Sequence, residues 1–297
     1  MDFPSFAAEQ FFDTVVRVNS NKIPYFNNLR ARILALFQTN QNRPIRTIYS
    51  PSKTILALWC TPRSRSSAFL MMMKQRKDFE IRPEPFEASA YYSDERILGD
   101  NCPADPEWPR EQYNYDKILD SLKSQLQKCG KLFVKDHPFY FIHVVNENFL
   151  NSFFHTFLIR HPKQALPSYF NVWPNVTFQE TGYEAQRQMF EYVLEHTGKM
   201  PIVIDADDLV NKPEATIRAY CSHVGIPFIP ESLRWDLSSE EKNGLPELWH
   251  STLKNSAGIQ TTNNSYLGVH ENDDLEKLYN ASMPHYTRML ANKLIVT

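Results

Sequence analysis

Apolar residues gather in short unbroken runs that alternate along the chain with longer stretches in which apolar positions recur at helical spacing. The short runs predict strands at Thr54–Cys60, Lys131–Lys135, Thr156–Arg160 and Pro201–Asp205, and the strand-like segment Phe79–Arg82 predicts a fifth. The longer stretches predict helices, at Ser66–Lys77, Tyr115–Lys128, Pro138–Leu150, Lys163–Asn171, Tyr183–His196 and Ala215–Val224. Such alternation predicts a three-layer α/β fold, with a central parallel sheet of about five strands flanked by helices.

Length and composition indicate how many domains the chain forms. The chain has 297 residues, of which 42% are apolar, enough for one sizeable core, and no linker rich in Pro, Gly or Ser divides it. We therefore expect a single domain over residues 51–297, preceded by a helical extension over residues 1–50.

Charge and cysteine usage narrow the classes of partner. The 32 basic and 34 acidic residues leave a net charge of −2 without a polybasic segment, which argues against nucleic acid and anionic membranes. The four cysteines lack the spacing of a zinc site, so no metal is expected. No signal region or membrane-length apolar run is present. These features predict a cytoplasmic protein that acts on a small molecule.

Candidate chemistry lies where two of the predicted strands end. The first strand leads into a loop and helix start rich in basic and hydroxyl side chains, namely Arg63, Ser64, Arg65, Ser66 and Ser67. The N-terminus of a helix is a favourable place for an anion. At the end of a later strand stands Arg160, with Ser168 eight positions on in the next predicted helix. Two such sites predict one ligand with two separated anionic groups.

The loop does not fit a nucleoside triphosphatase. Such a loop needs the pattern G-x-x-x-x-G-K-[ST], and this chain has neither the glycines nor the lysine there. A metal-dependent small-molecule kinase, which would require ATP and magnesium, is therefore a weaker alternative. A non-catalytic nucleotide-binding protein is a second one.

Three motifs in this order resemble the sulfotransferase family. Pro62–Ser67 resembles its 5′-phosphosulfate loop, Arg160 with Ser168 resembles its 3′-phosphate motif, and Lys135–His137 resembles its K-x-H segment. The resemblance runs from about residue 55 to about residue 235 and is closest to the bacterial and fungal branch that tailors small metabolites. It implies a P-loop-type sulfotransferase fold. It also implies 3′-phosphoadenosine 5′-phosphosulfate (PAPS) as co-substrate, the bisphosphate PAP as product, and no metal.

The resemblance also implies roles for individual residues. His137 would be the general base, and Arg63 and Lys135 would stabilise charge on the bridging oxygen. Glu84 and Glu87 are the rival bases, because some branches of the family use a glutamate there; they could instead line an acceptor pocket. Because Pro138 follows His137, we expect His137 to cap a helix whose positive end keeps the imidazole neutral.

The acceptor would be a hydroxyl or amine of a small metabolite. Similarity to enzymes of cyanobacterial alkaloid toxin pathways of the saxitoxin type suggests a polar guanidinium alkaloid. The aperiodic segment 82–110 is expected to form part of the acceptor site, and residues 254–272 are a candidate lid over the nucleotide. The family's dimerisation sequence is missing, which suggests a monomer or a weak homodimer.

Overall fold

The strands that the apolar runs predicted all form, at the predicted places, in one parallel sheet. The computed structural model describes residues 49–98, 113–236, 256–261 and 266–296, all within one compact unit that spans residues 46–297. The predicted helical extension over residues 1–50 thus lies almost wholly outside the described residues. The strands are β1 (Ile55–Cys60), β2 (Glu80–Pro83), β3 (Leu132–Asp136), β4 (Phe153–Ile159) and β5 (Ile202–Asp205). Their order in the sheet is β2-β3-β1-β4-β5.

The central strand β1 divides the interior into two hydrophobic cores. Every residue of β1 is buried. Ile55, Ala57 and Trp59 belong to one core, whereas the alternate residues Leu56, Leu58 and Cys60 belong to the other. Successive side chains of a strand point to opposite faces of its sheet, so a strand covered on both sides reads as an unbroken apolar run. This alternation confirms the three-layer arrangement.

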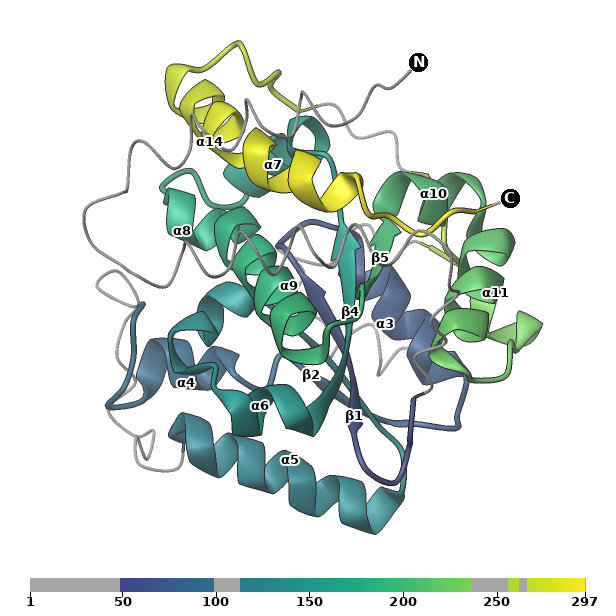
Figure 1. Cartoon of the computed structure of the whole chain (residues 1–297). Helices are drawn as coiled ribbons and strands as arrows, with labels where there is room; N and C mark the ends of the chain where they lie inside the picture. Colours follow the sequence, from purple (N-terminus) through teal and green to yellow (C-terminus); the bar gives the residue numbers. More distant parts are fainter. Residues whose placement is uncertain (1–48, 99–112, 237–255, 262–265, 297) are drawn as a thin grey trace, which may run out of the picture. The chain divides into compact units, whose positions relative to one another are not determined.

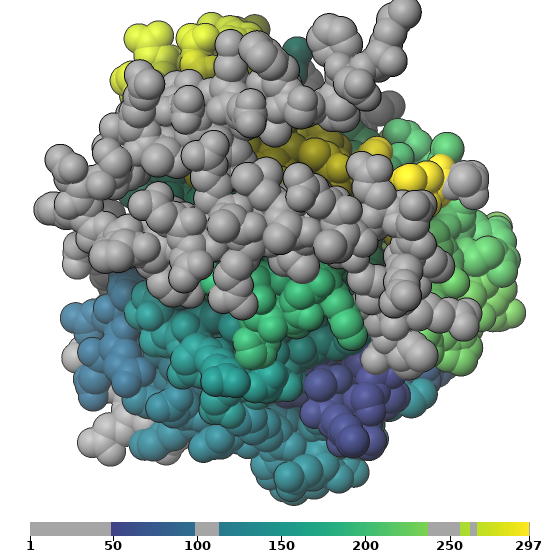
Figure 2. All heavy atoms as spheres, viewed as in Figure 1, coloured from purple at the N-terminus to yellow at the C-terminus, as the bar shows by residue number. Residues whose placement is uncertain are grey.

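Helices cover both faces of the sheet (Figure 1). The core on one face includes residues of α5 (Tyr115–Cys129), α9 (Tyr183–Thr197) and α14 (Asp273–Leu290). The core on the other face includes residues of α3 (Ser66–Gln75) and α11 (Pro213–Val224). The shorter helices are α4 (Glu87–Tyr92), α6 (Glu147–Ser152), α7 (Pro162–Phe170), α8 (Phe178–Thr181) and α10 (Ala206–Asn211). Figure 2 shows this unit from the same side, with α5 and α6 at the bottom and α11 at the right.

One predicted helix is wrong. The segment Pro138–Leu150 forms two single 3-10 turns, Pro138–Tyr140 and Ile142–Val144, followed by the short helix α6. Burial explains the break, because Phe139, Tyr140 and Phe141 are all in the core. A continuous helix would turn these consecutive residues to different sides, whereas the irregular turn buries all three.

Four of the described helices were not expected, namely α4, α8, α10 and α14. Helix α4 lies within the segment 82–110, which was expected to lack regular structure; residues 99–112 of that segment lie outside the described residues. Helix α14 begins after Asn272, whose side chain accepts hydrogen bonds from two backbone N–H groups, and carries acidic residues in its first turn. Both features are ordinary signals of a helix start. Within the described ranges, no helix combines the length and the apolar character that a membrane span requires.

Candidate functional site

Parallel pairing brings the predicted site residues to one edge of the sheet. Strands β1, β3 and β4 are adjacent and parallel, so their carboxyl ends lie at the same edge. The loop after β1 holds Arg63, His137 follows β3, and Arg160 follows β4. In α/β folds of this kind, ligands bind beyond the carboxyl ends of the strands.

The loop after β1 has an unusual backbone. Arg63 and Arg65 both adopt left-handed conformations, with φ of 59° and 70°. Non-glycine residues rarely do so, and such strain concentrates at functional sites. Arg65 stands where the family pattern often has glycine, so the backbone conformation suits that pattern although the side chain does not. Arg65 is also the N-cap residue of α3, which begins without a side-chain cap.

The two anion motifs are joined by direct contacts. Arg63 Nε donates to Ser168 Oγ on α7 at 3.0 Å. The guanidinium of Arg160 in turn donates to the carbonyl oxygen of Arg63 at 2.7 Å. Sequence reasoning placed Arg63 at the 5′ side of a donor. In the structure, Arg63 also contacts Ser168, the serine of the 3′-phosphate motif.

Arg63, Arg65 and Arg160 lie close enough to repel one another, which makes the site strongly positive. Burial, followed by repulsion from Arg65 and Arg63, lowers the pKa of Arg160 to about 10, so it remains a cation at neutral pH. Burial also lowers the pKa of Arg63 and of Arg65. An anion placed among these side chains would relieve their mutual repulsion.

The hydroxyl groups of the loop fit a phosphosulfate. Ser64 is fully buried, and its Oγ has no hydrogen-bond partner among the described residues. Buried hydroxyl groups are normally satisfied, so an orphan in a loop of this kind points to a ligand. Ser66 and Ser67 are the first two residues of α3, one buried and one partly buried. The residues present therefore suit the group that the loop pattern implies.

His137 is held with its Nε2 atom toward the site. Its Nδ1 lies 2.9 Å from the carbonyl oxygen of Cys60, which can only accept, so Nδ1 carries the proton and Nε2 holds the lone pair. Burial and the nearby cation of Lys135 lower the pKa of His137 to about 4, with Glu84 opposing the shift. The imidazole is therefore neutral at pH 7, as a general base must be.

The reason for this neutrality differs from the expectation. His137 precedes a single 3-10 turn rather than a helix, and its side chain makes no capping hydrogen bond. Burial and Lys135, not a helix dipole, set its protonation state. His137 does occupy the N-cap position of this turn, with Pro138 as the first residue, but its side chain is not the cap.

Lys135 and Glu84 form an ion pair at the same edge. The Lys135 ammonium contacts the Glu84 carboxylate, with side-chain exposures of 4% and 26%. Burial opposes the charge on Lys135, but Glu84, together with Cys60 and Asp136, more than offsets this effect and raises the pKa of Lys135 above the usual range. His137 Nε2 lies 3.5 Å from Lys135 Nζ and 3.7 Å from Glu84 Oε1. The structure therefore brings both candidate bases together.

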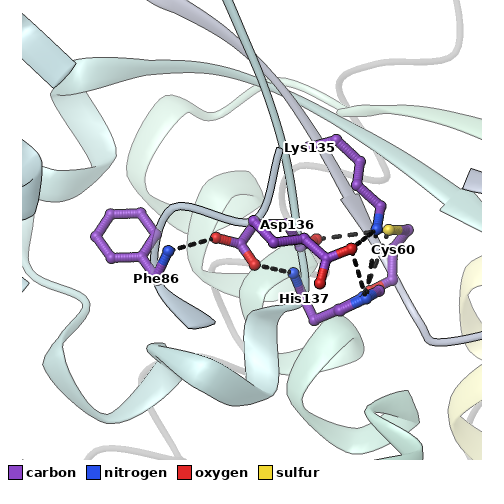
Figure 3. Close-up of polar contacts among 6 residues, drawn as sticks. Cys60, Phe86, Lys135, Asp136 and His137 are labelled. Carbon is purple, nitrogen blue, oxygen red and sulfur yellow. Dashed lines mark hydrogen bonds and ion pairs between the residues drawn. The ribbon is translucent and has the colours of Figure 1, made fainter. Parts of the chain in front are cut away.

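The carboxylate of Asp136 holds the backbone next to His137 and Glu84 in place. This carboxylate is fully buried and accepts from the backbone N–H groups of His137 at 2.7 Å and of Phe86 at 2.9 Å. Figure 3 shows Asp136 between these two residues, with Lys135 and His137 turned toward Cys60. Burial, then Glu84, raises the pKa of Asp136, and the two N–H groups oppose the shift. Its place inside K-x-H was the only sequence signal of this role.

The C-terminal part of the chain also reaches the loop. Arg65 donates to the carbonyl oxygen of Gln260 at 3.0 Å, and the Tyr266 hydroxyl interacts with Arg63. Both residues fall in the segment 254–272 that was expected to cover the nucleotide. Residues 254, 255 and 262–265 lie outside the described ranges, so the lid itself stays a prediction.

Comparison with known proteins agrees with the three motifs and extends them. Residues 53–293 match the family model of the sulfotransferase domain, well beyond residue 235, where the motif resemblance ended. Branched-chain-amino-acid aminotransferase-like protein 2 of Arabidopsis thaliana is 29% identical over 210 residues, which are 70% of this chain and 36% of that protein. Sulfotransferase ppzF of Metarhizium majus is 29% identical over 192 residues, covering 52% of this chain and 56% of that protein.

The chain therefore spans only part of the length of these relatives, 36% and 56%. Among solved structures, the sulfotransferase domain of the Synechococcus PCC 7002 olefin synthase matches 81% of this chain and 97% of its own. The sequence identity is 16% and the TM-score is 0.48.

Proposed function

Because the chain belongs to the sulfotransferase family, we propose that it transfers a sulfuryl group from PAPS to a hydroxyl or amine of a small metabolite. One observation supports the donor above all. Arg63, Arg160 and Ser168 are linked by hydrogen bonds across two motifs whose side chains suit two separated anionic groups. A nucleotide with a 3′-phosphate and a 5′-phosphosulfate has this distribution of charge.

In this proposal Arg160 and Ser168 bind the 3′-phosphate, and Arg63, which contacts Ser168, belongs to the loop that binds the 5′ side. Ser64, Ser66, Ser67 and Arg65, with backbone N–H groups at the start of α3, bind the 5′ side. Arginine side chains and helix N-termini both favour phosphate oxygens, and their contacts are charge-assisted.

The residues at the end of β3 would carry the chemistry. PAPS supplies a sulfuryl group joined to its 5′-phosphate through a bridging oxygen. His137 Nε2 takes the proton of the acceptor hydroxyl or amine as the new bond to sulfur forms. Lys135 and Arg63 stabilise the charge that develops as the bond between sulfur and the bridging oxygen breaks. The sulfated acceptor and PAP leave as products.

We further propose a cationic acceptor, such as a polar guanidinium alkaloid. The carboxylate of Glu84 lies next to His137, and Tyr169 lies within electrostatic reach of Tyr91 and Glu84. Carboxylates and tyrosine rings together favour a cation. Glu84 could alternatively serve as the base.

The proposal also includes the cellular compartment, the metabolic role and the oligomeric state. We expect a cytoplasmic enzyme of secondary metabolism that acts as a monomer or a weak homodimer, without nucleic acid, membrane or metal. Sedimentation of the purified protein over a range of concentrations tests the oligomeric state.

Calorimetry tests the donor. We expect PAP to bind more tightly than ATP, with no dependence on magnesium. Tighter, magnesium-dependent binding of ATP would instead favour the small-molecule kinase. Release of PAP from PAPS, measured with and without a panel of amines, guanidines and phenols, separates an enzyme from a non-catalytic nucleotide-binding protein.

A further inference from the structure

The ion pair between Glu84 and Lys135 places a negative charge beside the proposed reaction centre of an anionic donor. Lys135 is almost fully buried, and its ammonium group is engaged by the Glu84 carboxylate. Under the proposed function, this same ammonium group stabilises the sulfuryl group. Lys135 therefore has two competing anionic partners.

The backbone fixes the position from which the Glu84 side chain extends. Glu84 adopts a left-handed conformation with φ of 46° immediately after β2. Its N–H donates to the carbonyl oxygen of Lys135 at 2.7 Å. Two residues further on, the N–H of Phe86 donates to Asp136 at 2.9 Å. Strained conformations persist where the surroundings over-determine them, so this turn is held against β3. The side-chain torsions of Glu84 can still change without moving the turn.

A sulfuryl group and the Glu84 carboxylate cannot both contact Lys135 without like-charge repulsion. The oxygens of the sulfuryl group share a negative charge, and repulsion between close anions is strong in a site of low polarity. Lys135 can accept the new anion if Glu84 moves away.

We propose that Glu84 is the counterion that the sulfuryl group displaces from Lys135, and that the released carboxylate then binds the acceptor. The inference rests on the proposed function and deepens it. Glu84 Oε1 lies 3.7 Å from His137 Nε2, so a group bound by this carboxylate is close to the proposed base. Donor binding thus prepares the acceptor site, and the two substrates bind in order, with the donor first.

Affinity for two nucleotides tests the displacement. PAP lacks the sulfuryl group and PAPS carries it, so their affinities, measured by calorimetry without acceptor, isolate the interaction at Lys135. In Glu84→Gln we expect the affinity for PAPS relative to PAP to rise about tenfold, because the competing charge is gone. Glu84→Gly should change the ratio in the same direction. Glycine adopts positive φ without strain, so this variant is expected to fold.

Glu80→Gln is the matched control. Glu80 is an exposed carboxylate on the same strand β2, and its side chain accepts from Gln125 rather than contacting Lys135, so its removal should change the ratio less than about twofold. An unchanged ratio in both folded Glu84 variants overturns the inference, and so does an equal shift in Glu80→Gln. If the wild-type protein binds neither nucleotide and transfers no sulfuryl group, the proposed function itself fails. If the wild-type protein binds both nucleotides and transfers the sulfuryl group, but the affinity ratio is unchanged in the Glu84 variants, only the displacement is rejected.

Discussion

The Nδ1 atom of His137 lies 2.9 Å from the carbonyl oxygen of Cys60, the last residue of β1. This contact joins the proposed base directly to the strand that carries the phosphate loop. It fixes the ring orientation, and it leaves Nε2 as the atom available for a proton. The distance between donor loop and base is therefore set by the pairing of β1 with β3 rather than by a mobile segment.

Replacing the proposed base should affect the rate more than the binding of the nucleotide. His137→Ala is expected to reduce turnover by about 10²–10⁴-fold, the usual contribution of a general base. Its affinity for PAP should stay within about twofold of wild type, because the polar contacts of the His137 ring are with Cys60, Lys135 and Glu84. Steady-state kinetics and calorimetry measure the two quantities. His223→Ala, on the exposed surface of α11, is the control. Near-normal turnover in His137→Ala, with loss of activity in Glu84→Gln, would assign the base to Glu84.

Replacing the proposed 3′-phosphate ligand should weaken nucleotide binding. Arg160→Ala is expected to reduce the free energy of PAP binding by about 2–3 kcal/mol, because a charge-assisted contact and a support of the Arg63 carbonyl are both lost. Arg218→Ala controls for the loss of a positive charge, since Arg218 is exposed, pairs with Glu214 and lies over the Phe228 ring. Equal affinities of the two variants for PAP would remove Arg160 from the donor site.

Two buried neutral histidines should make stability depend on pH. Burial is the main cause that lowers the pKa of both His137 and His155 to about 4, whereas the unfolded chain has a value near 6.5. Between these values the two positions bind more protons in the unfolded chain, so the contribution of these histidines to the free energy of unfolding falls as the pH drops from about 6.5 to about 4. The slope is at most about 1.4 kcal/mol per pH unit for each histidine.

Urea unfolding at a series of pH values measures this slope. His155 accepts from Trp59 Nε1 at 2.8 Å through Nδ1, which requires the neutral ring. In His155→Gln the slope near pH 5 should decrease relative to wild type, although the variant is less stable at pH 7. An unchanged slope would show that His155 takes up no proton on unfolding.

Asp136 should support both the fold and the rate. In Asp136→Asn the amide group must face one of the two backbone N–H groups that the carboxylate accepts, so we expect a loss of about 1–3 kcal/mol in the free energy of unfolding. Because the same contacts position Glu84 and His137, turnover should fall while PAP affinity changes little. Asp120→Asn, on the exposed side of α5, should leave both unchanged. Unaltered turnover in a destabilised Asp136→Asn would limit Asp136 to a structural role.

The architecture could be predicted from the sequence because its signals are local. The strands other than β2 contain an apolar run followed by a loop or a cap, and the unbroken run of β1 reflects burial on both faces. The prediction failed at Pro138–Leu150, where a helical pattern is overridden by the burial of consecutive aromatic residues. Local propensity is a weak guide when tertiary packing opposes it.

The sequence predicted where the candidate site residues lie in the fold, but not the contacts between them. The motifs placed Arg63, Ser168 and His137 near each other because parallel strands end at one edge. The pairing of Lys135 with Glu84 could not be predicted, since it depends on a left-handed turn after β2 that no glycine marks. The neutrality of His137 was expected, but its cause was burial, which only the packed structure reveals.

The contact between Arg63 and Ser168 bridges 105 positions of the chain. Contacts of long range form late, because a large loop must close before they contribute any stability. A polypeptide emerging from the ribosome therefore cannot assemble this site before α7 has been synthesised and docked beside β1. A nucleotide bound there would act as a clamp on two distant parts of the chain, so native-state hydrogen exchange of β1 and β4 should slow together when it binds.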